Sequence, residues 1–450
     1  MKGDIFDYAA KLLEASENHE QYRGRECINL IASEGLKSPA VHEMLNRCRD
    51  LECRYSEGEN DLAGHAKRRH YQGQKYLTEI EDVTVDLMKS VLRADWADIR
   101  CVSGTHANLV TLKGLMLATG NRKMAVTPLS CGAHISHDYT GLAGMIIGLE
   151  TINLSFDIDE MNIDPDKSAE IIRASRPGIV IFGSSVFLFP QPVKELVDAA
   201  HDVGAYVVYD AAHVLGLIVG RQFQDPLQEG ADFVTASTHK TFPGPQGGLV
   251  YGRLGDNEKR VKAAKRILHA IFPLATSNTH PGRFPALGLA AVEMSLFGET
   301  LAEETVRNAQ CAGQYLSDKG IRVLGENKGF TKSHQIVVDV TEFGGGAKIA
   351  DRLERTNIIL NKNLLPYDNQ KDKENPSGLR IGFQDVTRRG FTHDDVEVFC
   401  GWMCKIIKDE AEPATVREEV MMLAKKFDGV KYGFNSFDEA VECITKRTKN

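Results

Sequence analysis

The sequence lacks a long apolar run, an excess of basic residues and a paired cysteine pattern. Its most apolar stretch, AYVVYDAAHVLGLIVG, is interrupted by Asp210 and His213 and is too short to span a bilayer. The first 22 residues carry several acidic side chains and no apolar centre of the signal-peptide type. These absences predict a cytoplasmic protein that does not interact with membranes.

The charge balance and the cysteines exclude further classes of protein. The chain has 54 Lys and Arg against 62 Asp and Glu, a net charge of -8, which argues against a general nucleic-acid binder. Its nine cysteines are scattered and odd in number, which indicates reduced thiols rather than a disulfide framework. Cys400 and Cys404 lack the paired spacing of a zinc site, so we expect no metal centre.

The length and the hydrophobic patterning predict the domain organisation. A chain of 450 residues with 42% hydrophobic content is long enough for two or three packed units. Between residues 98 and 250, continuous apolar strands alternate with helices, which predicts an α/β fold with a mainly parallel sheet covered on both faces. We predict a helical arm over 1–30, a large domain over 31–300 and a small α+β domain over 301–450 that ends in helices.

Polar residues follow three of these strands directly. Ser185 and Lys240 come just after the apolar runs GIVIF and ADFVTAS, and Asp210 closes the run AYVVYD. Ligands of parallel α/β sheets collect beyond the carboxyl ends of the strands, so we expect the three side chains to converge on one site. Burial at the end of a core strand disfavours the charge of Lys240 and favours a nucleophilic amine. The alternative is a surface lysine in a tight turn.

An amine in this place suits pyridoxal phosphate if particular partners surround it. Ser103, Gly104 and Thr105 open a predicted helix, whose N-terminus would accept a phosphate. Asp210 would keep the pyridine nitrogen protonated, and His134 would offer a flat partner to the ring. Each feature alone also has an ordinary structural explanation, as a helix cap, a turn residue or a structural histidine.

Taken together, the motifs resemble a known family. NLIASEG, YSEG, SGTHAN, LSCGAHISH, DAAHVLGL, STHKT, NKN and SGLRIG occur in the order and approximate spacing of serine hydroxymethyltransferases, pyridoxal-phosphate enzymes of fold type I. The resemblance covers roughly residues 25–395. It implies a seven-stranded, mainly parallel sheet in the large domain and pyridoxal 5′-phosphate as the cofactor.

The resemblance also implies roles for individual residues. The catalytic residues would be Glu57, His134, Asp210 and Lys240, with Lys240 bonded to the cofactor and Glu57 handling the hydroxyl proton of the substrate. The cofactor would be bound by Tyr55, Ser103, Gly104, Thr105, His134, Ser185, Asp210, His213, His239 and Lys240. The substrate would be bound by Ser33, Tyr55, Glu57, Tyr71, His213 and Arg380. Arg380 would grip its carboxylate as a fork.

The implied activity is one-carbon transfer between serine or glycine and tetrahydrofolate or a modified pterin, with Leu129 and Asn363 as pterin contacts. Tyr55 and Glu57 would enter the site from a neighbouring subunit, which implies a homodimer. The segments SNTHPG, EMSLFGE and GENKGFTKSHQ are instead similar to L-threonine transaldolases, which leaves a folate-independent aldolase or transaldolase as the alternative. A non-catalytic pyridoxal-phosphate-binding protein and an aminotransferase are weaker rivals.

The sequence departs from the family pattern in a few places. The stretch ENDLAGHAKRRHYQG after YSEG is longer than the usual connection, and Gln246 replaces an arginine. We expect the basic run 67–69 to face solvent. We also expect Gly344, Gly345 and Gly346 to form a turn before a helix rather than a second phosphate loop.

Overall fold

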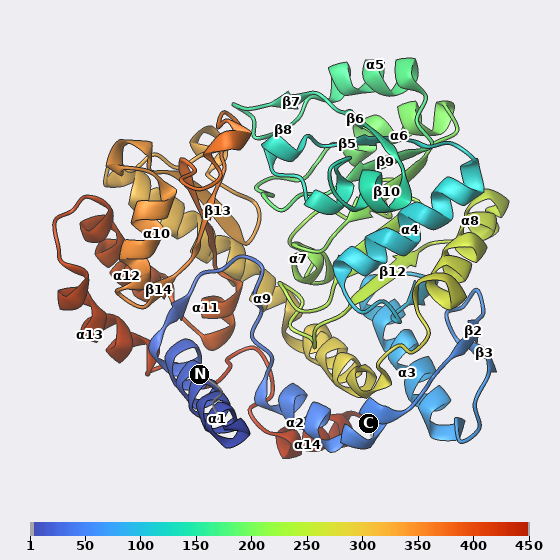
Figure 1. Ribbon diagram of the computed structural model, residues 1–450, viewed down its shortest axis with the longest axis horizontal. Coiled ribbons are helices and arrows are strands. Elements are labelled where there is room, and N and C mark those ends of the chain that lie inside the picture. Colours follow the sequence, from blue (N-terminus) through green and yellow to red (C-terminus); the bar gives the residue numbers. More distant parts are fainter. Residues whose placement is uncertain (1–3, 449–450) are drawn as a thin grey trace.

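A seven-stranded sheet forms the centre of the larger of two packed units (Figure 1). The computed structural model describes residues 4–448. The strands in spatial order are β4 Trp96–Asp98, β12 Gly248–Gly252, β11 Phe233–Ser237, β10 Tyr206–Asp210, β9 Ile179–Phe182, β5 Lys123–Val126 and β6 Glu150–Asn153. All neighbouring pairs are parallel except the two that involve β12, which is antiparallel to β11 and to β4. The predicted α/β fold with a mainly parallel sheet is therefore confirmed.

The central strands β9 and β10 are buried at every position because both faces of the sheet are covered there. In β10, Val207 and Tyr209 belong to one hydrophobic core, while Tyr206 and Val208 belong to another on the opposite face. Successive side chains of a strand point to opposite faces, so such a strand needs apolar residues at every position. The helices of this unit are α2 Pro39–Arg47, α3 Lys75–Leu92, α4 Gly104–Thr119, α5 Pro165–Ser175, α6 Val193–Asp202, α7 Leu215–Val219 and α8 Glu258–His269.

The second unit is a small sheet packed against helices. Its strands lie in the order β13 Gln335–Asp339, β16 Gly378–Gly382 and β15 Asn361–Asn363, and they are antiparallel. Its helices are α10 Gly346–Glu354, α11 Gln384–Arg389, α12 His393–Ile407 and α13 Pro413–Ala424. Gly344 and Gly345 adopt φ of 103° and 92° immediately before α10, so the glycine run forms the turn that the sequence predicted.

One long helix joins the two units. α9 spans Phe284–Asp318, and its first half packs in the large core while Ala309, Ala312 and Leu316 pack in the small one. The chain also crosses between the units near its ends. β1 Ile28–Asn29 pairs with β14 Ile358–Ile359 of the small unit, and α14 Phe437–Thr448 packs back against α2. α9 continues through residue 300 without a break, so it marks no boundary between the units there. The domain boundaries at residues 30 and 300 remain predictions.

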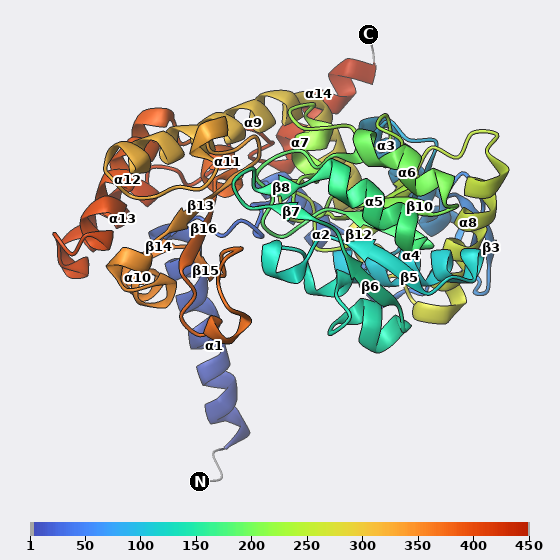
Figure 2. The ribbon, with the colours of Figure 1, turned by 90° about the horizontal axis from the view of Figure 1, so that it is seen from above.

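The N-terminal helix lies apart from both cores. α1 Ile5–Gln21 contains no buried residue, and Figure 2 shows it extending away from the body of the molecule. Its apolar side chains include Phe6, which is 76% exposed. Among the described helices, none is both long and apolar enough to cross a membrane.

Candidate active site

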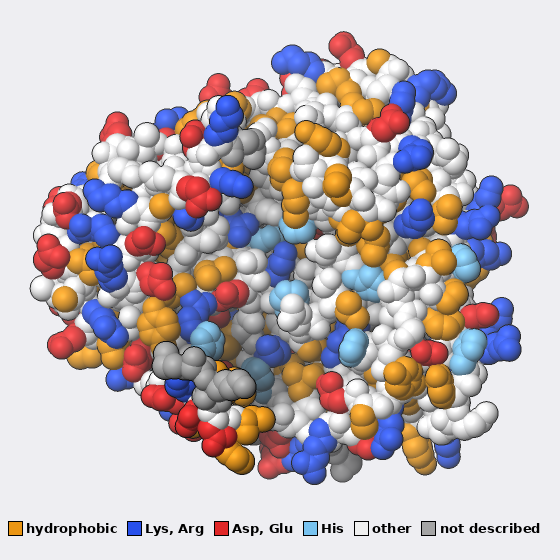
Figure 3. Space-filling view, in the orientation of Figure 1, with side chains coloured by type: hydrophobic (Ala, Val, Ile, Leu, Met, Phe, Trp, Pro, Cys, Tyr) orange, Lys and Arg blue, Asp and Glu red, His pale blue; other side chains and the backbone are white. Residues whose placement is uncertain are grey.

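Most of the predicted cofactor residues line one cavity of about 180 Å³ beyond the carboxyl ends of β9, β10 and β11. Figure 3 shows histidine and basic side chains near the hollow where the two units meet. The predicted residues in the lining are Ser103, Gly104, Thr105, His134, Ser185, Asp210, His213, His239 and Lys240. Asn108, Ser184, Ala212, Ser237 and Gln246 complete it. Residues far apart in the sequence therefore converge as the strand pattern predicted.

Lys240 lies three residues beyond the end of β11 in a buried position. Burial lowers the pKa of its amine to about 8, although the charge of Asp210 opposes this and that of Arg380 adds to it. A Cβ atom at Gly35 would overlap the carbonyl oxygen of Lys240, so the NLIASEG segment packs directly against the backbone of the lysine. A neutral amine is therefore accessible near physiological pH, as a nucleophilic lysine requires.

Asp210 ends β10 and is held by three hydrogen bonds. Its Oδ2 accepts from Nδ2 of Asn108 at 2.7 Å and from Nε2 of His137 at 3.0 Å, and its Oδ1 accepts from the backbone N–H of Ala212 at 2.9 Å. Burial alone would raise the pKa of Asp210, but the hydrogen bond and charge of His137, together with Asn108, hold it well below its usual range. The cavity therefore contains a fixed carboxylate.

The N-terminus of α4 faces the same cavity. Ser103 caps this helix, and its hydroxyl accepts from the backbone N–H of His106 at 3.1 Å. The N–H groups of a first helical turn have no partner within the helix and favour an anion. Gly104 approaches Ser237 so closely that a Cβ atom would overlap the Ser237 hydroxyl, which explains glycine at this position.

The histidines that line the cavity are neutral. Burial lowers the pKa of His134 and of His239 to about 4, and it lowers the pKa of His213 well below its usual value, with the charge of Lys240 acting in the same direction. Nδ1 of His213 and Nδ1 of His239 are buried without a hydrogen-bond partner among the described residues. The described part of the chain therefore leaves both nitrogens unsatisfied.

Arg380 reaches the cavity region from β16 of the small unit. Its Nη1 donates to the carbonyl oxygen of Ser185 at 2.8 Å, and its Nε donates to Oδ1 of Asn361 at 3.2 Å. Burial lowers its pKa to about 10, so the guanidinium remains charged at neutral pH. A buried cation of this kind suits a substrate carboxylate.

Arg380 contacts the lining residue Ser185 without lining the cavity itself, and six further predicted residues also lie outside the lining: Ser33, Tyr55, Glu57, Tyr71, Leu129 and Asn363. The rings of Tyr55 and Tyr71 lie with their centroids 5.4 Å apart, and these side chains are 47% and 49% exposed. Asn363 donates from Nδ2 to the carbonyl oxygen of Leu364 at 2.6 Å. The cavity of a single chain thus lacks the glutamate that the family resemblance places in the site.

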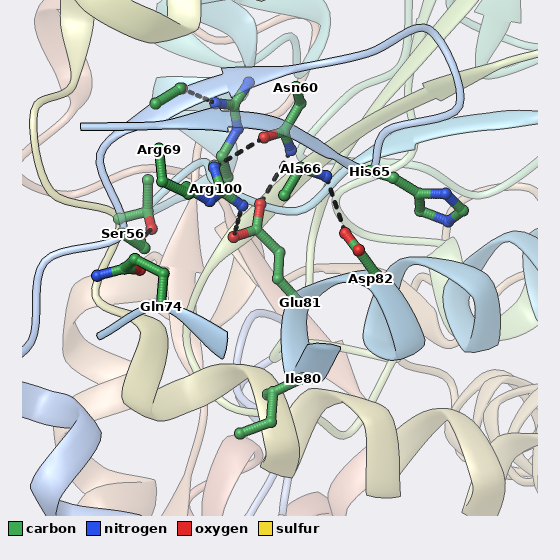
Figure 4. Close-up of polar contacts among 12 residues, drawn as sticks. Ser56, Asn60, His65, Ala66, Arg69, Gln74, Ile80, Glu81, Asp82 and Arg100 are labelled. Atoms are coloured by element: carbon green, nitrogen blue, oxygen red, sulfur yellow. Dashed lines mark hydrogen bonds and ion pairs between the residues drawn. The ribbon is translucent and has the colours of Figure 1, made fainter. Parts of the chain in front are cut away.

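The extended loop after YSEG forms a hairpin of β2 Gly58–Asn60 and β3 Ala66–Arg69, which is fixed by buried polar groups (Figure 4). Nη2 of Arg69 lies 2.6 Å from Oε2 of Glu81 in α3, and Nδ2 of Asn60 donates to Oε1 of Glu81 at 2.9 Å. The expectation that the basic run faces solvent is therefore wrong for Arg69, because its charge is needed beside a glutamate with no exposed surface.

The same loop is tied to the segment before α9. Ser56 and Thr279 share a hydrogen bond between their hydroxyl groups, and Nδ2 of Asn278 donates to the carbonyl oxygen of Arg54 at 2.9 Å. Gln74 donates from Nε2 to the carbonyl oxygen of Tyr55 at 2.7 Å. The residues around Glu57 are consequently held in one defined conformation at the surface.

Comparison with known proteins identifies the family. The family model described as serine hydroxymethyltransferase matches residues 7–403. The chain belongs to the serine hydroxymethyltransferase family. It is 43% identical over 424 residues to the serine hydroxymethyltransferase of Staphylothermus marinus, covering 94% of this chain and 93% of that protein. It is 44% identical over 432 residues to the enzyme of Pyrococcus horikoshii, covering 95% and 97%.

A solved structure shows the same fold. The crystal structure of L-threonine transaldolase from Pseudomonas fluorescens matches with a TM-score of 0.81 and 25% identity, over 99% of this chain and 98% of that one. The family consists of pyridoxal-phosphate-dependent transferases, so the predicted enzyme class, cofactor and fold type are confirmed. The cavity fits that cofactor, since it combines a helix N-terminus, a fixed carboxylate and unpartnered imidazole nitrogens.

The sequence reasoning missed Asn108 and His137, both of which contact Asp210. The signal was present in the quoted motifs. Asn108 lies one helical turn after Gly104 in SGTHAN, so it faces the same side of α4, and His137 closes the motif that begins before His134.

Proposed function

We propose that this protein interconverts serine and glycine by breaking and forming the Cα–Cβ bond, with the one-carbon unit passing to or from tetrahydrofolate or a modified pterin. The observation that carries the proposal is the presence of Lys240 and an ionised Asp210 in one cavity, with Arg380 beside it. The curated relatives named above carry the same activity in their names.

The geometry of the cavity supports the cofactor contacts that we propose. When bound, pyridoxal phosphate supplies an electron sink that stabilises negative charge at Cα of an amino acid. Lys240 would hold it covalently, and the ionised Asp210 would keep a proton on its ring nitrogen. Ser103, Gly104 and Thr105 would bind its phosphate at the α4 N-terminus. His134 would contact the ring face, while Ser185, His213 and His239 would supply polar contacts around it.

The proposed substrate contacts come from both units. Arg380 would bind the amino-acid carboxylate with Ser33 beside it, and its charge is retained because its pKa of about 10 lies well above neutrality. Glu57 would take the hydroxyl proton of serine as the Cα–Cβ bond breaks, and return it in the reverse direction. Leu129 and Asn363 remain the proposed contacts for a pterin.

We propose a homodimer in which each cavity is completed by the other subunit. Glu57, Tyr55 and Tyr71 lie outside the lining of their own cavity, yet hydrogen bonds hold their loop in a defined conformation. This supports their delivery to the cavity of a second copy. We also propose a cytoplasmic location, which is supported by nine cysteines that are all unpaired.

Mixed dimers test the shared site. Lys240→Ala and Glu57→Gln should each be almost inactive alone, with serine cleavage by Glu57→Gln lowered by ~10²-fold or more while the cofactor stays bound. Randomly mixed subunits should regain roughly a quarter of the wild-type rate, because half of the dimers then contain one intact site. No recovery on mixing would place Glu57 in the site of its own chain.

The structural match to the transaldolase supports one alternative, a folate-independent exchange of aldehydes on glycine. Serine labelled at Cβ distinguishes the two reactions by NMR. Conversion to glycine that requires tetrahydrofolate or tetrahydromethanopterin supports one-carbon transfer. Exchange of the acetaldehyde unit of threonine for an added aldehyde, at a rate indifferent to either pterin, would replace it with the transaldolase activity.

A further inference from the structure

His334 is a buried histidine that contacts two parts of the site without lining the cavity. It lies directly before β13 in the small unit and has no exposed surface. Its ring stacks on the ring of His213, with centroids 5.7 Å apart and an interplanar angle of 23°. Its Nε2 lies 3.0 Å from the carbonyl oxygen of Ala32. One side chain therefore links the cavity wall to the residue that precedes Ser33.

The segment around Ser33 depends on the small unit for its conformation. The backbone N–H of Gly382 donates to the carbonyl oxygen of Leu30 at 2.8 Å. Nε2 of Gln384 donates to the carbonyl oxygens of Ile31 at 2.8 Å and Glu34 at 2.6 Å. Together with the bond from His334 to Ala32, these contacts hold successive carbonyl groups on both sides of Ser33.

The hydrogen-bond partners of the His334 ring determine its tautomer, and its surroundings determine its protonation state. A carbonyl oxygen only accepts, so Nε2 carries the proton, and Nδ1 is left without a partner among the described residues. Burial lowers its pKa to about 3; the bond to Ala32 opposes this shift, and the charges of Arg380 and Lys240 add to it. The ring is neutral and adds no charge to a site that already holds two cations.

An apolar ring would fill the same space at lower cost. Burying Nδ1 without a hydrogen bond is unfavourable, so a histidine serving only the core would be a poor choice here. The cost of the unpaired Nδ1 is offset if the Nε2–H group donates a hydrogen bond and the ring face packs against a second ring. The hydrogen bond and the stack are the two contacts that use them.

We propose that His334 is a positioning residue that sets the plane of His213 at the cofactor and the place of Ser33 at the substrate carboxylate. The proposal rests on the proposed function, which assigns those roles to His213 and Ser33. His334 touches neither ligand and acts through these two residues. Because His334 belongs to the small unit, the orientation of His213 and the position of Ser33 both depend on how that unit packs against the large one.

Two substitutions separate the two contacts. His334→Phe keeps a flat ring against His213 and removes the donor to Ala32, whereas His334→Gln keeps a donor near the position of Nε2 and removes the ring. We expect His334→Phe to weaken glycine binding to the holoenzyme by about fivefold or more, with cofactor affinity unchanged. We expect His334→Gln to weaken pyridoxal phosphate binding to the apoenzyme by a similar factor.

The measurements are titration calorimetry with glycine and fluorescence titration of the apoenzyme with the cofactor, alongside KM and kcat for serine. Ser33→Ala in the His334→Phe background should add little to the loss of glycine affinity, because both changes remove the same contact. Equal losses in both titrations for both variants, no loss in either, or failure of both variants to fold would overturn the proposal. If the wild-type protein binds no cofactor or glycine, the proposed function itself fails.

Discussion

Nε2 of His137 lies 3.0 Å from Oδ2 of Asp210, and both side chains are buried. Asn108 reaches the same carboxylate oxygen from α4 at 2.7 Å. Two donors on one oxygen make the ionised form of a buried carboxyl group the stable one. The charge of the Asp210 carboxylate is thus maintained by residues from two other parts of the chain.

Removing His137 should raise the pKa of Asp210, because desolvation is then opposed only by Asn108 and the backbone. A lowered carboxyl pKa stabilises the folded state fully at pH values above the ordinary carboxyl pKa, and this stabilisation is lost as the pH falls through the lowered value. In His137→Phe the acid limb of kcat/KM should therefore move to higher pH by about one unit or more. His269→Phe, at an exposed position outside the cavity, is the control. An unmoved acid limb would remove His137 from this role.

Lys240→Ala should abolish the absorbance of the lysine-bound cofactor near ~420 nm. The physical reason is that its amine alone among the lysines lines the cavity in the part of the chain that the structure describes. Lys37→Ala is a demanding control, since burial lowers the pKa of that lysine as well. Persistence of the band in Lys240→Ala, or its loss in Lys37→Ala, would contradict the assignment.

The rate at which the apoenzyme captures pyridoxal phosphate should rise with pH through about 8 and then level off. The reactive form is the neutral amine, and the pKa of Lys240 is lowered from 10.5 to about 8. Between these values the folded apoenzyme binds fewer protons than the unfolded chain, so its free energy of unfolding should increase with pH over the same interval. Stopped-flow absorbance and urea titrations test both statements. A capture rate that keeps rising to pH 10 would indicate an unperturbed lysine.

Glu81→Gln should loosen the hairpin that follows Glu57. The substitution leaves the buried guanidinium of Arg69 without a full countercharge, and breaking such a pair costs about 3–5 kcal/mol. Trypsin should then cleave more rapidly at Lys67 and Arg68, which are exposed on β3. Glu79→Gln, on the exposed face of the same helix, should leave the cleavage rate unchanged. Equal rates in the two variants would show that the ion pair does not hold the hairpin.

Much of the site was predictable because strand ends and helix starts are local features. The apolar runs of β9, β10 and β11 placed Ser185, Asp210 and Lys240 at one edge of one sheet, since parallel strands share their carboxyl side. The cap at Ser103 was equally readable, because capping depends on a few adjacent residues. Motif order then supplied the family, which the comparisons confirmed.

The remaining features depend on contacts between distant segments. The local sequence predicts that Arg69 belongs to a solvated basic run, whereas in the structure it pairs with the buried Glu81. Nothing in the local sequence specifies that pair. The position of His334 against His213 and Ala32 likewise requires the two units to pack together. Both arrangements depend on burial and on partners far away in the sequence. The hydrophobic periodicity of a segment carries no information about either.

The sequence by itself determined the α/β architecture, the place of Lys240 beyond β11, the carboxylate of Asp210 at the end of β10 and the helix start at Ser103. These follow from apolar periodicity and from residue types at element ends, which act over a few positions. Only the tertiary structure decided how the carboxylate of Asp210 is kept ionised, which residues fix Ser33, and that Glu57 lies outside its own cavity. These depend on desolvation and on hydrogen bonds between groups hundreds of residues apart, which exist only once the two units have packed.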